Sequence, residues 1–118
     1  MEHAHLVADG ADGRAPRLVL GDRTRIGRFA VVTARDDLVI DDAVSTSDHV
    51  VIGDETPDGP TGVTTIESGA YLGCACVITS GVRIGAGAYV GEGAVVVDDV
   101  PAHAVVYGNP AVVVRSFP

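Results

Sequence analysis

Histidines and cysteines are the side chains of this chain that could move a proton or attack a substrate. The 118 residues include four histidines, His3, His5, His49 and His103, and two cysteines. Imidazole gains and loses its proton near neutral pH, so a histidine beside a substrate can act as a general base. His49 ends the string Ser-Thr-Ser-Asp-His and is followed after a few residues by a segment rich in proline and glycine. His49 is therefore the first candidate for chemistry.

The other candidates have simpler explanations. His3 and His5 lie in residues 1–17, which lack helical periodicity, and we expect an irregular leader there rather than a metal site. Cys74 and Cys76 form a Cys-x-Cys pair, and zinc would need more ligands than this pair offers. We expect no metal requirement, and two free thiols that fit a reducing, cytoplasmic environment.

Composition excludes several classes of protein. The hydrophobic fraction of 47% is too high for a disordered chain. The formal net charge of −8, with arginine as the basic residue and no lysine, argues against a nucleic-acid-binding face and against adsorption to an anionic membrane. No apolar run is long enough to span a bilayer, and the sequence pattern predicts no signal peptide.

Aliphatic residues recur at every sixth position over most of the chain. One series runs through Ile66, Leu72, Ile78, Ile84, Val90 and Val96. A second series, of small or β-branched residues, runs through Ala70, Cys76, Val82, Ala88, Ala94 and Val100. The same spacing occurs upstream at Leu20, Ile26 and Val32, and then at Ile40, Thr46 and Ile52. It is interrupted at 34–39 and at 54–65, where aspartate, proline and glycine predict an extruded loop.

A period of six fits neither an α-helix, which repeats at about 3.6 residues, nor a strand, which repeats at about 2.0. It resembles the hexapeptide-repeat family, whose fold is a left-handed parallel β-helix shaped as a triangular prism. The resemblance implies an all-β fold of about four to five coils over residues 18–101, followed by a tail at 102–118. Because the aliphatic residue of each hexad points into such a prism, we expect Cys76 inside and Cys74 outside.

The end of the chain is similar to the tail of hexapeptide acyltransferases. Asp99-Val100-Pro101 and Gly108-Asn109-Pro110-Ala111 match the tail pattern of that family, as does Arg115. Their position directly after the hexads makes the match specific. The resemblance implies an acyl-CoA-dependent acyltransferase, such as a sugar or xenobiotic O-acetyltransferase. It also implies a tail that leaves the prism and ends as a strand beside it.

The family binds coenzyme A in the groove between two prisms of a homotrimer. Carried over to this sequence, the implied contacts are Tyr71, Cys74, Glu92, Gly93, Ala94, Val97, Asp98, Asn109, Pro110 and Arg115. Val97 and Asp98 stand where the family has a Thr-Lys pair, and Val112 stands at its usual tail lysine. A phosphate that loses a charge-assisted hydrogen bond binds more weakly by about 1.5–3 kcal/mol. The sequence thus predicts a donor site with fewer cations than is usual.

His49 falls at a corner slot of the repeat, where we expect a side chain to point away from the prism. Many acyltransferases of the family have a similar [ST]xxDH string whose histidine is catalytic. The resemblance therefore implies that His49 accepts a proton from an acceptor hydroxyl or amine as it attacks the thioester. Asp48 or Glu55 would orient the imidazole, and a backbone N–H near Cys74 of a neighbouring subunit would stabilise the oxyanion. His103 falls at a position that the family varies, and we expect it on the surface.

Two alternatives follow from the same residues. The missing tail lysines and the short chain also suit a non-catalytic hexapeptide-repeat scaffold, or a subunit whose coenzyme A site has decayed. A zinc enzyme of the carbonic-anhydrase type on this prism would need three histidines around the metal, which His49 cannot supply.

Outward aliphatic residues such as Val51, Val95 and Val97 predict a homotrimer with sites at the subunit interfaces. The acceptor and the length of the acyl chain stay open.

Overall fold

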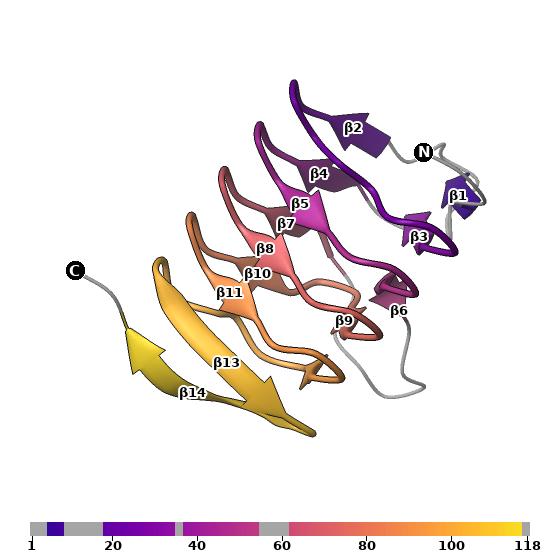
Figure 1. The fold of residues 1–118 in the computed structure, drawn as a ribbon. Helices are drawn as coiled ribbons and strands as arrows, with labels where there is room; N and C mark the ends of the chain where they lie inside the picture. The colour runs from indigo at the N-terminus through magenta and orange to yellow at the C-terminus, as the bar shows by residue number, and fades with distance from the viewer. Residues whose placement is uncertain (1–4, 9–17, 35–36, 55–61, 117–118) are drawn as a thin grey trace.

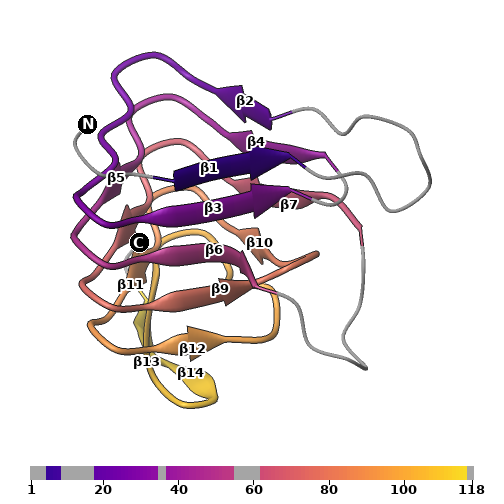
Figure 2. The same cartoon turned by 90° about the vertical axis from the view of Figure 1, so that its right-hand side faces the viewer.

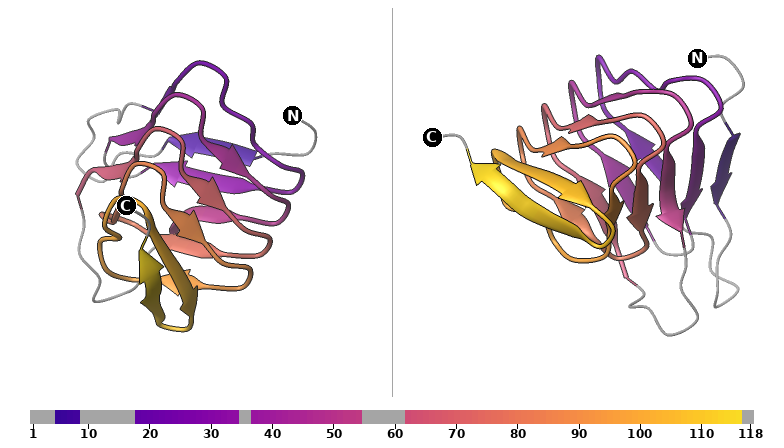
Figure 3. Two further views of the ribbon diagram at one scale, coloured as in Figure 1. Left: turned by 60° about the vertical axis from the view of Figure 1, so that its left-hand side comes forward. Right: turned by 60° about the horizontal axis from the view of Figure 1, so that its bottom comes forward.

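The computed structural model describes residues 5–8, 18–34, 37–54 and 62–116, and within these ranges all regular elements are β-strands. The chain winds into a three-sided solenoid whose coils stack along one axis (Figure 1). Figure 2 looks onto one sheet, and Figure 3 shows the three sides closing around the interior. In the described ranges, no helix has the length and apolar character needed to cross a bilayer.

Three sheets form the sides of the solenoid. Sheet A contains β1 (His5–Ala8), β3 (Val31–Ala34), β6 (Val51–Asp54), β9 (Val77–Thr79) and β12 (Val95–Val96). Sheet B contains β2 (Leu18–Leu20), β4 (Leu38–Ile40), β7 (Thr64–Ile66) and β10 (Arg83–Ile84). Sheet C contains β5 (Ser45–Thr46), β8 (Tyr71–Leu72), β11 (Tyr89–Val90), β13 (Ala104–Gly108) and β14 (Ala111–Ser116). From β4 to β12 the chain visits the sheets in the fixed order B, C, A, so each of these coils contributes one strand to every side. In the coil that follows, Val100 forms only an isolated bridge to Ile84 of sheet B before the chain enters β13 in sheet C.

The hexad residues form the core, as the period predicts. The aliphatic series from 66 to 96 is at most 1% exposed, and the small series beside it is at most 5% exposed. A strand of two or three residues offers one inward position, and the small residue fits beside it before the next corner. Leu20 departs from the pattern at 38% exposure, because β2 is an edge strand of sheet B.

One corner, between sheets C and A, repeats the same turn in successive coils. Its left-handed residues are Phe29, His49, Ala75 and Gly93, with φ values of 58°, 62°, 59° and 71°. Backbone hydrogen bonds join the turns from coil to coil: the His49 amide donates to the Arg28 carbonyl at 2.9 Å, and the Ala75 amide donates to the Asp48 carbonyl at 3.0 Å. We call the turns that hold these residues, at 28–29, 48–49, 74–75 and 92–93, the C–A corner column. Side chains at this corner therefore line up along the axis.

The structure corrects two predicted boundaries. The leader is not irregular throughout, because His5–Ala8 forms β1 and pairs in parallel with β3. The prism does not end at residue 101, because β13 pairs in parallel with β11 and continues sheet C to Gly108. The tail after it is a strand, as expected: β14 folds back antiparallel on β13. Most of the predicted loop at 54–65 lies outside the described residues.

Gly53 and Gly93 allow a matched test of this packing. Both have positive φ, at 86° and 71°, but a Cβ on Gly53 would overlap the Thr33 carbonyl oxygen, whereas a Cβ on Gly93 would meet nothing within 4 Å. Gly93→Ala should therefore cost only the left-handed strain, about 1–2 kcal/mol of unfolding free energy. Gly53→Ala adds overpacking against the neighbouring coil, for a total of about 2–5 kcal/mol. Urea unfolding of the two variants measures the difference, and equal losses would contradict the close approach of the coils.

Candidate functional site

His49 lies in the turn between β5 and β6, with its side chain exposed. Its imidazole stacks on the ring of Phe29 from the preceding coil, with ring centroids 5.0 Å apart and planes 19° from parallel. Within the described part of the chain, no hydrogen bond to the ring nitrogens of His49 is formed. The structure therefore places the predicted base outside the prism, as the corner slot predicts.

Asp48 lies beside His49, but its carboxylate contacts the neighbouring coil. One oxygen accepts a hydrogen bond from the Arg28 amide at 2.8 Å, and the other lies 3.6 Å from the Arg28 guanidinium. The ion pair is solvent-exposed on both sides and contributes at most about 1 kcal/mol. These contacts fix one turn against the next. An orienting role of Asp48 toward the imidazole stays a prediction, and Glu55 lies outside the described residues.

The two cysteines occupy opposite environments, as predicted. Cys74 is exposed in the C–A corner column, one coil beyond Asp48, and Cys76 is buried in the core. Burial raises the pKa of the Cys76 thiol to about 12, and the nearby Cys74 adds to the rise. The thiolate is the reactive form of cysteine, so Cys76 is a packing residue.

Three tyrosines form a ladder on the outer face of sheet C. Tyr71 and Tyr89 occupy paired positions in β8 and β11, and their rings stack with centroids 5.0 Å apart. Tyr107 of β13 follows at 6.3 Å, tilted by 44°. At the other end of the ladder, the Tyr71 hydroxyl lies 2.6 Å from the hydroxyl of Ser47, two residues before His49. The ladder therefore leads from the His49 turn toward the C-terminal strands.

Sequence reasoning singled out Tyr71 but missed Tyr89 and Tyr107. The three tyrosines are spaced by eighteen residues, which is one full coil, and this spacing was a usable signal. The tilt of the last ring has a local cause. In the final coil Val105, and not Tyr107, pairs with Tyr89, so that coil is two residues shorter and Tyr107 lies one outward position further along.

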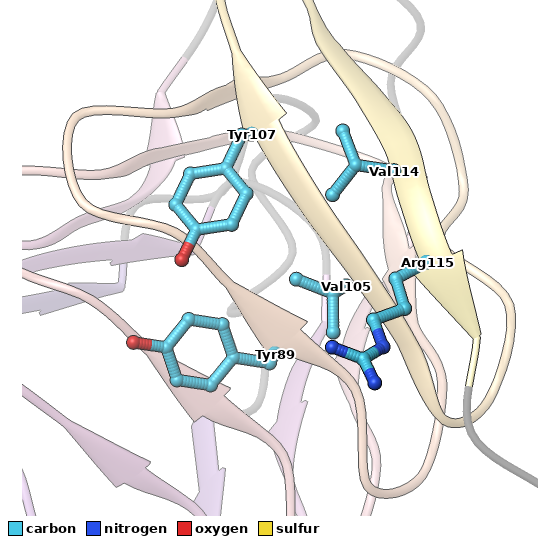
Figure 4. Close-up of a pocket in the computed structure, with 5 residues that line it drawn as sticks. All are labelled: Tyr89, Val105, Tyr107, Val114 and Arg115. Atoms are coloured by element: carbon cyan, nitrogen blue, oxygen red, sulfur yellow. The ribbon is translucent and has the colours of Figure 1, made fainter.

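A hollow of about 420 Å³ lies at the C-terminal end of this ladder. It is lined by Tyr89, Val105, Tyr107, Val114 and Arg115 (Figure 4). The two tyrosine rings lie on one side of Val105, and the Arg115 guanidinium reaches in from β14 on the other. Desolvation raises the pKa of Tyr89, and the neighbouring tyrosines and Glu92 raise it further, so its phenol stays neutral near pH 7. Apolar walls, aromatic rings and one cation together suit an aromatic group linked to an anion.

The remaining predicted contact residues divide among three places. Glu92 and Gly93 are exposed in the C–A corner column, one coil beyond Cys74, and the neighbouring Ala94 is buried. Val97 and Asp98 are exposed beyond β12, at the corner that leads from sheet A to sheet B. The turn between β13 and β14 holds Asn109 and Pro110, both exposed. The structure thus brings Cys74, Glu92 and Gly93 into line with His49, and it puts Val97 and Asp98 at a different corner.

No group of three or more histidine, cysteine or acidic side chains able to hold a metal ion occurs among the described residues. His103 is exposed, as expected, in the turn between sheets B and C, with φ of 60°.

No protein-family model matches the chain. Among curated proteins, it is 34% identical to serine acetyltransferase 2 of Arabidopsis thaliana over 85% of this chain and 31% of the relative. It is 54% identical to 2,3,4,5-tetrahydropyridine-2,6-dicarboxylate N-acetyltransferase of Enterococcus faecalis over 44% of this chain and 22% of the relative. The chain therefore spans about a fifth to a third of the length of these relatives.

Solved structures match most of the chain. A hexapeptide-repeat acetyltransferase of Vibrio cholerae, crystallised with acetyl coenzyme A, aligns with a TM-score of 0.77 at 25% identity, over 99% of this chain and 71% of that one. A maltose O-acetyltransferase of Clostridium difficile aligns with a TM-score of 0.76 over 100% of this chain and 69% of that one, and at 19% identity it supports the fold alone. The all-β fold in parallel sheets is therefore one that acetyltransferases use. The homologues of this chain are hexapeptide-repeat acetyltransferases.

The two thiols should differ sharply in reactivity. At pH 8 a disulfide reagent such as DTNB should label one thiol per folded chain, and Cys74→Ser should remove this label, because Cys76 stays protonated and covered. Cys76 should react only after unfolding. Its raised pKa also makes folding less favourable as the pH climbs from about 9 toward about 12, because the unfolded thiol ionises first. Two thiols reacting at equal rates in the folded protein would contradict the placement of Cys76.

Proposed function

We propose that this chain forms an acyltransferase site that moves an acetyl group from acetyl-CoA to a hydroxyl or amine of a sugar or other small molecule. The observation that supports it is the exposed imidazole of His49, which lies in an outward turn and stacks on Phe29. The turn belongs to a fold shared with an acetyltransferase crystallised with acetyl coenzyme A.

In the proposed step, His49 is the general base. The acceptor oxygen or nitrogen attacks the thioester carbonyl carbon while an imidazole nitrogen takes its proton. The tetrahedral intermediate then collapses, the carbon–sulfur bond breaks, and the coenzyme thiolate leaves and recovers a proton from the imidazolium. A backbone N–H near Cys74 of a neighbouring subunit would stabilise the oxyanion. Direct transfer requires no covalent enzyme intermediate when donor and acceptor are bound together.

The donor would lie along sheet C, with its nucleotide end in the hollow beside Arg115. Neighbouring coils are spaced by about 4.8 Å, so the way from the His49 turn to β13 is long enough for the pantetheine arm. Arg115 would pair with a phosphate, and Tyr89 and Tyr107 would contact the aromatic base. In this arrangement Arg115 supplies a positive charge for the phosphate, whereas Val112, which stands at the family's lysine position, carries no charge.

Sheet A offers the surface for the proposed homotrimer. Val31, Val51, Val77 and Val95 occupy paired outward positions on successive strands and form a straight, half-exposed aliphatic column. Packing against a second subunit would remove this column from water and bring another chain to the C–A corner. The proposed location is the cytoplasm, in keeping with two free thiols.

A second candidate is a scaffold without activity. Val97, Asp98 and Val112 favour it, because they replace the polar and basic residues that the family places around coenzyme A. Calorimetry with coenzyme A separates the two: no heat at millimolar ligand would support the scaffold and count against the enzyme.

The catalytic assignment can be tested against a matched histidine. His49 and His103 are both exposed and both have left-handed φ, at 62° and 60°. Asparagine tolerates this backbone, so His49→Asn and His103→Asn should fold equally well. His49→Asn should lower kcat by about 10²–10⁴-fold in an assay of free thiol released from acetyl-CoA with L-serine, maltose and glucosamine as acceptors. His103→Asn should leave the rate unchanged, and equal effects of the two changes would remove His49 from the mechanism.

If Arg115 binds a phosphate of coenzyme A, replacing it should weaken the binding of donors that carry the nucleotide and leave other donors unaffected. Arg115→Gln should raise KM for acetyl-CoA by about ten- to a hundredfold, because a charge-assisted hydrogen bond to phosphate is lost. With acetyl-pantetheine, which has no nucleotide, the same variant should match the wild type. An equal rise in KM with both donors would place the phosphate elsewhere.

A further inference from the structure

Resting on the proposed role of His49, we propose that Phe29 is the positioning residue for the imidazole. Its ring holds the base by stacking on one face, and not by the hydrogen bond to a ring nitrogen that a carboxylate would form. The claim concerns how the base is held, and Phe29 itself need touch no substrate.

The contact is a well-formed ring stack. Centroids 5.0 Å apart with planes 19° from parallel lie within the range of offset-stacked aromatic pairs. The backbone brings the rings together, because Phe29 and His49 occupy the same slot of successive turns, with φ values of 58° and 62°. The hydrogen bond from the His49 amide to the Arg28 carbonyl, at 2.9 Å, fixes one turn on the other.

In the described ranges, no hydrogen bond or ion pair holds the imidazole in place. The nearest acidic side chain in sequence, Asp48, directs both of its oxygens to Arg28. An exposed histidine in a turn otherwise rotates about two side-chain torsions, and a base that samples many orientations is seldom aligned with its proton. A ring on one face of the imidazole narrows that range.

Stacking also leaves the reactive edge of the base open. The lone pair and the N–H of imidazole lie in the plane of the ring, so a partner above the plane blocks neither nitrogen. A carboxylate partner, in contrast, would occupy one nitrogen. The exposure of Phe29, at 49%, fits a role other than core packing, because a large apolar side chain gains little stability in that position.

The kinetic test compares leucine and tyrosine at position 29. Phe29→Leu keeps an apolar side chain of similar bulk but removes the ring face, and Phe29→Tyr keeps the ring. With whichever of L-serine, maltose or glucosamine the wild type acetylates, Phe29→Leu should lower kcat by about two- to tenfold and leave KM for acetyl-CoA unchanged. Phe29→Tyr, which keeps the ring, should have the same kcat as the wild type. A Phe29→Leu variant with unchanged kcat, or one that loses through KM alone, would overturn the positioning role.

An NMR measurement tests the stack without turnover. In ¹H–¹³C spectra of the full chain, the ring protons of His49 should be shifted upfield by the Phe29 ring current in the wild type and in Phe29→Tyr, and this shift should vanish in Phe29→Leu. Carbon relaxation should show the His49 ring more mobile in Phe29→Leu, with His103 unchanged as the internal control. Equal shifts and mobility in all three proteins would show that Phe29 does not hold the ring.

The two proposals fail in different ways. If His49→Asn keeps full activity, the general-base assignment fails whatever the Phe29 variants do. If His49→Asn is inactive while Phe29→Leu matches the wild type in rate, ring-current shift and mobility, the general-base assignment of His49 is kept. The positioning role of Phe29 is then rejected. The far-ultraviolet circular dichroism of each variant should match the wild type, which separates both results from misfolding.

Discussion

The stacking of one coil on the next by backbone hydrogen bonds is the constraint on which the rest of this structure depends. Neighbouring coils lie about 4.8 Å apart. At the C–A corner the amides of His49, Ala75 and Gly93 each donate to the carbonyl of the residue that precedes their counterpart one coil back. A slot in the repeat therefore becomes a straight column in space. The buried aliphatic residues and the half-exposed valines of sheet A are such columns, and so are the stacked pairs Tyr71–Tyr89 and Phe29–His49.

This constraint explains what sequence alone could predict. A side chain's position modulo six decides whether it points inward, outward or into a corner, and so the core, the exposure of His49 and the contrast between Cys74 and Cys76 followed from counting. Counting residues in steps of six did not predict the strands that lie outside the six-residue repeat. The pairing of β1 depends on the edge that β3 offers, and the extension of sheet C to Gly108 depends on a shortened coil. Local sequence encodes neither.

Contacts within the candidate site were harder to predict than its placement. The repeat puts Asp48 next to His49 in sequence, but a turn directs neighbouring side chains apart, and the carboxylate of Asp48 bonds to Arg28 one coil away. The ring that does contact His49 comes from Phe29, twenty residues earlier, across an interruption of the repeat that obscures the register. The hollow around Arg115 needs β14 to fold back onto β13, a reversal that no periodicity indicates. Long-range pairing, more than side-chain type, limited the sequence reasoning.

The antiparallel return of β14 has a consequence for the reach of the molecule. It attaches Arg115 to the last coil, whereas His49 belongs to a coil nearer the start. The distance along the axis between His49 and Arg115 can therefore change only in steps of one coil, or about 4.8 Å. The number of coils between the two residues thus sets the length of the ligand that can contact both. Inserting one coil of eighteen residues between β8 and β11 would lengthen the ligand that can touch both ends, while leaving the chemistry at each end unaltered.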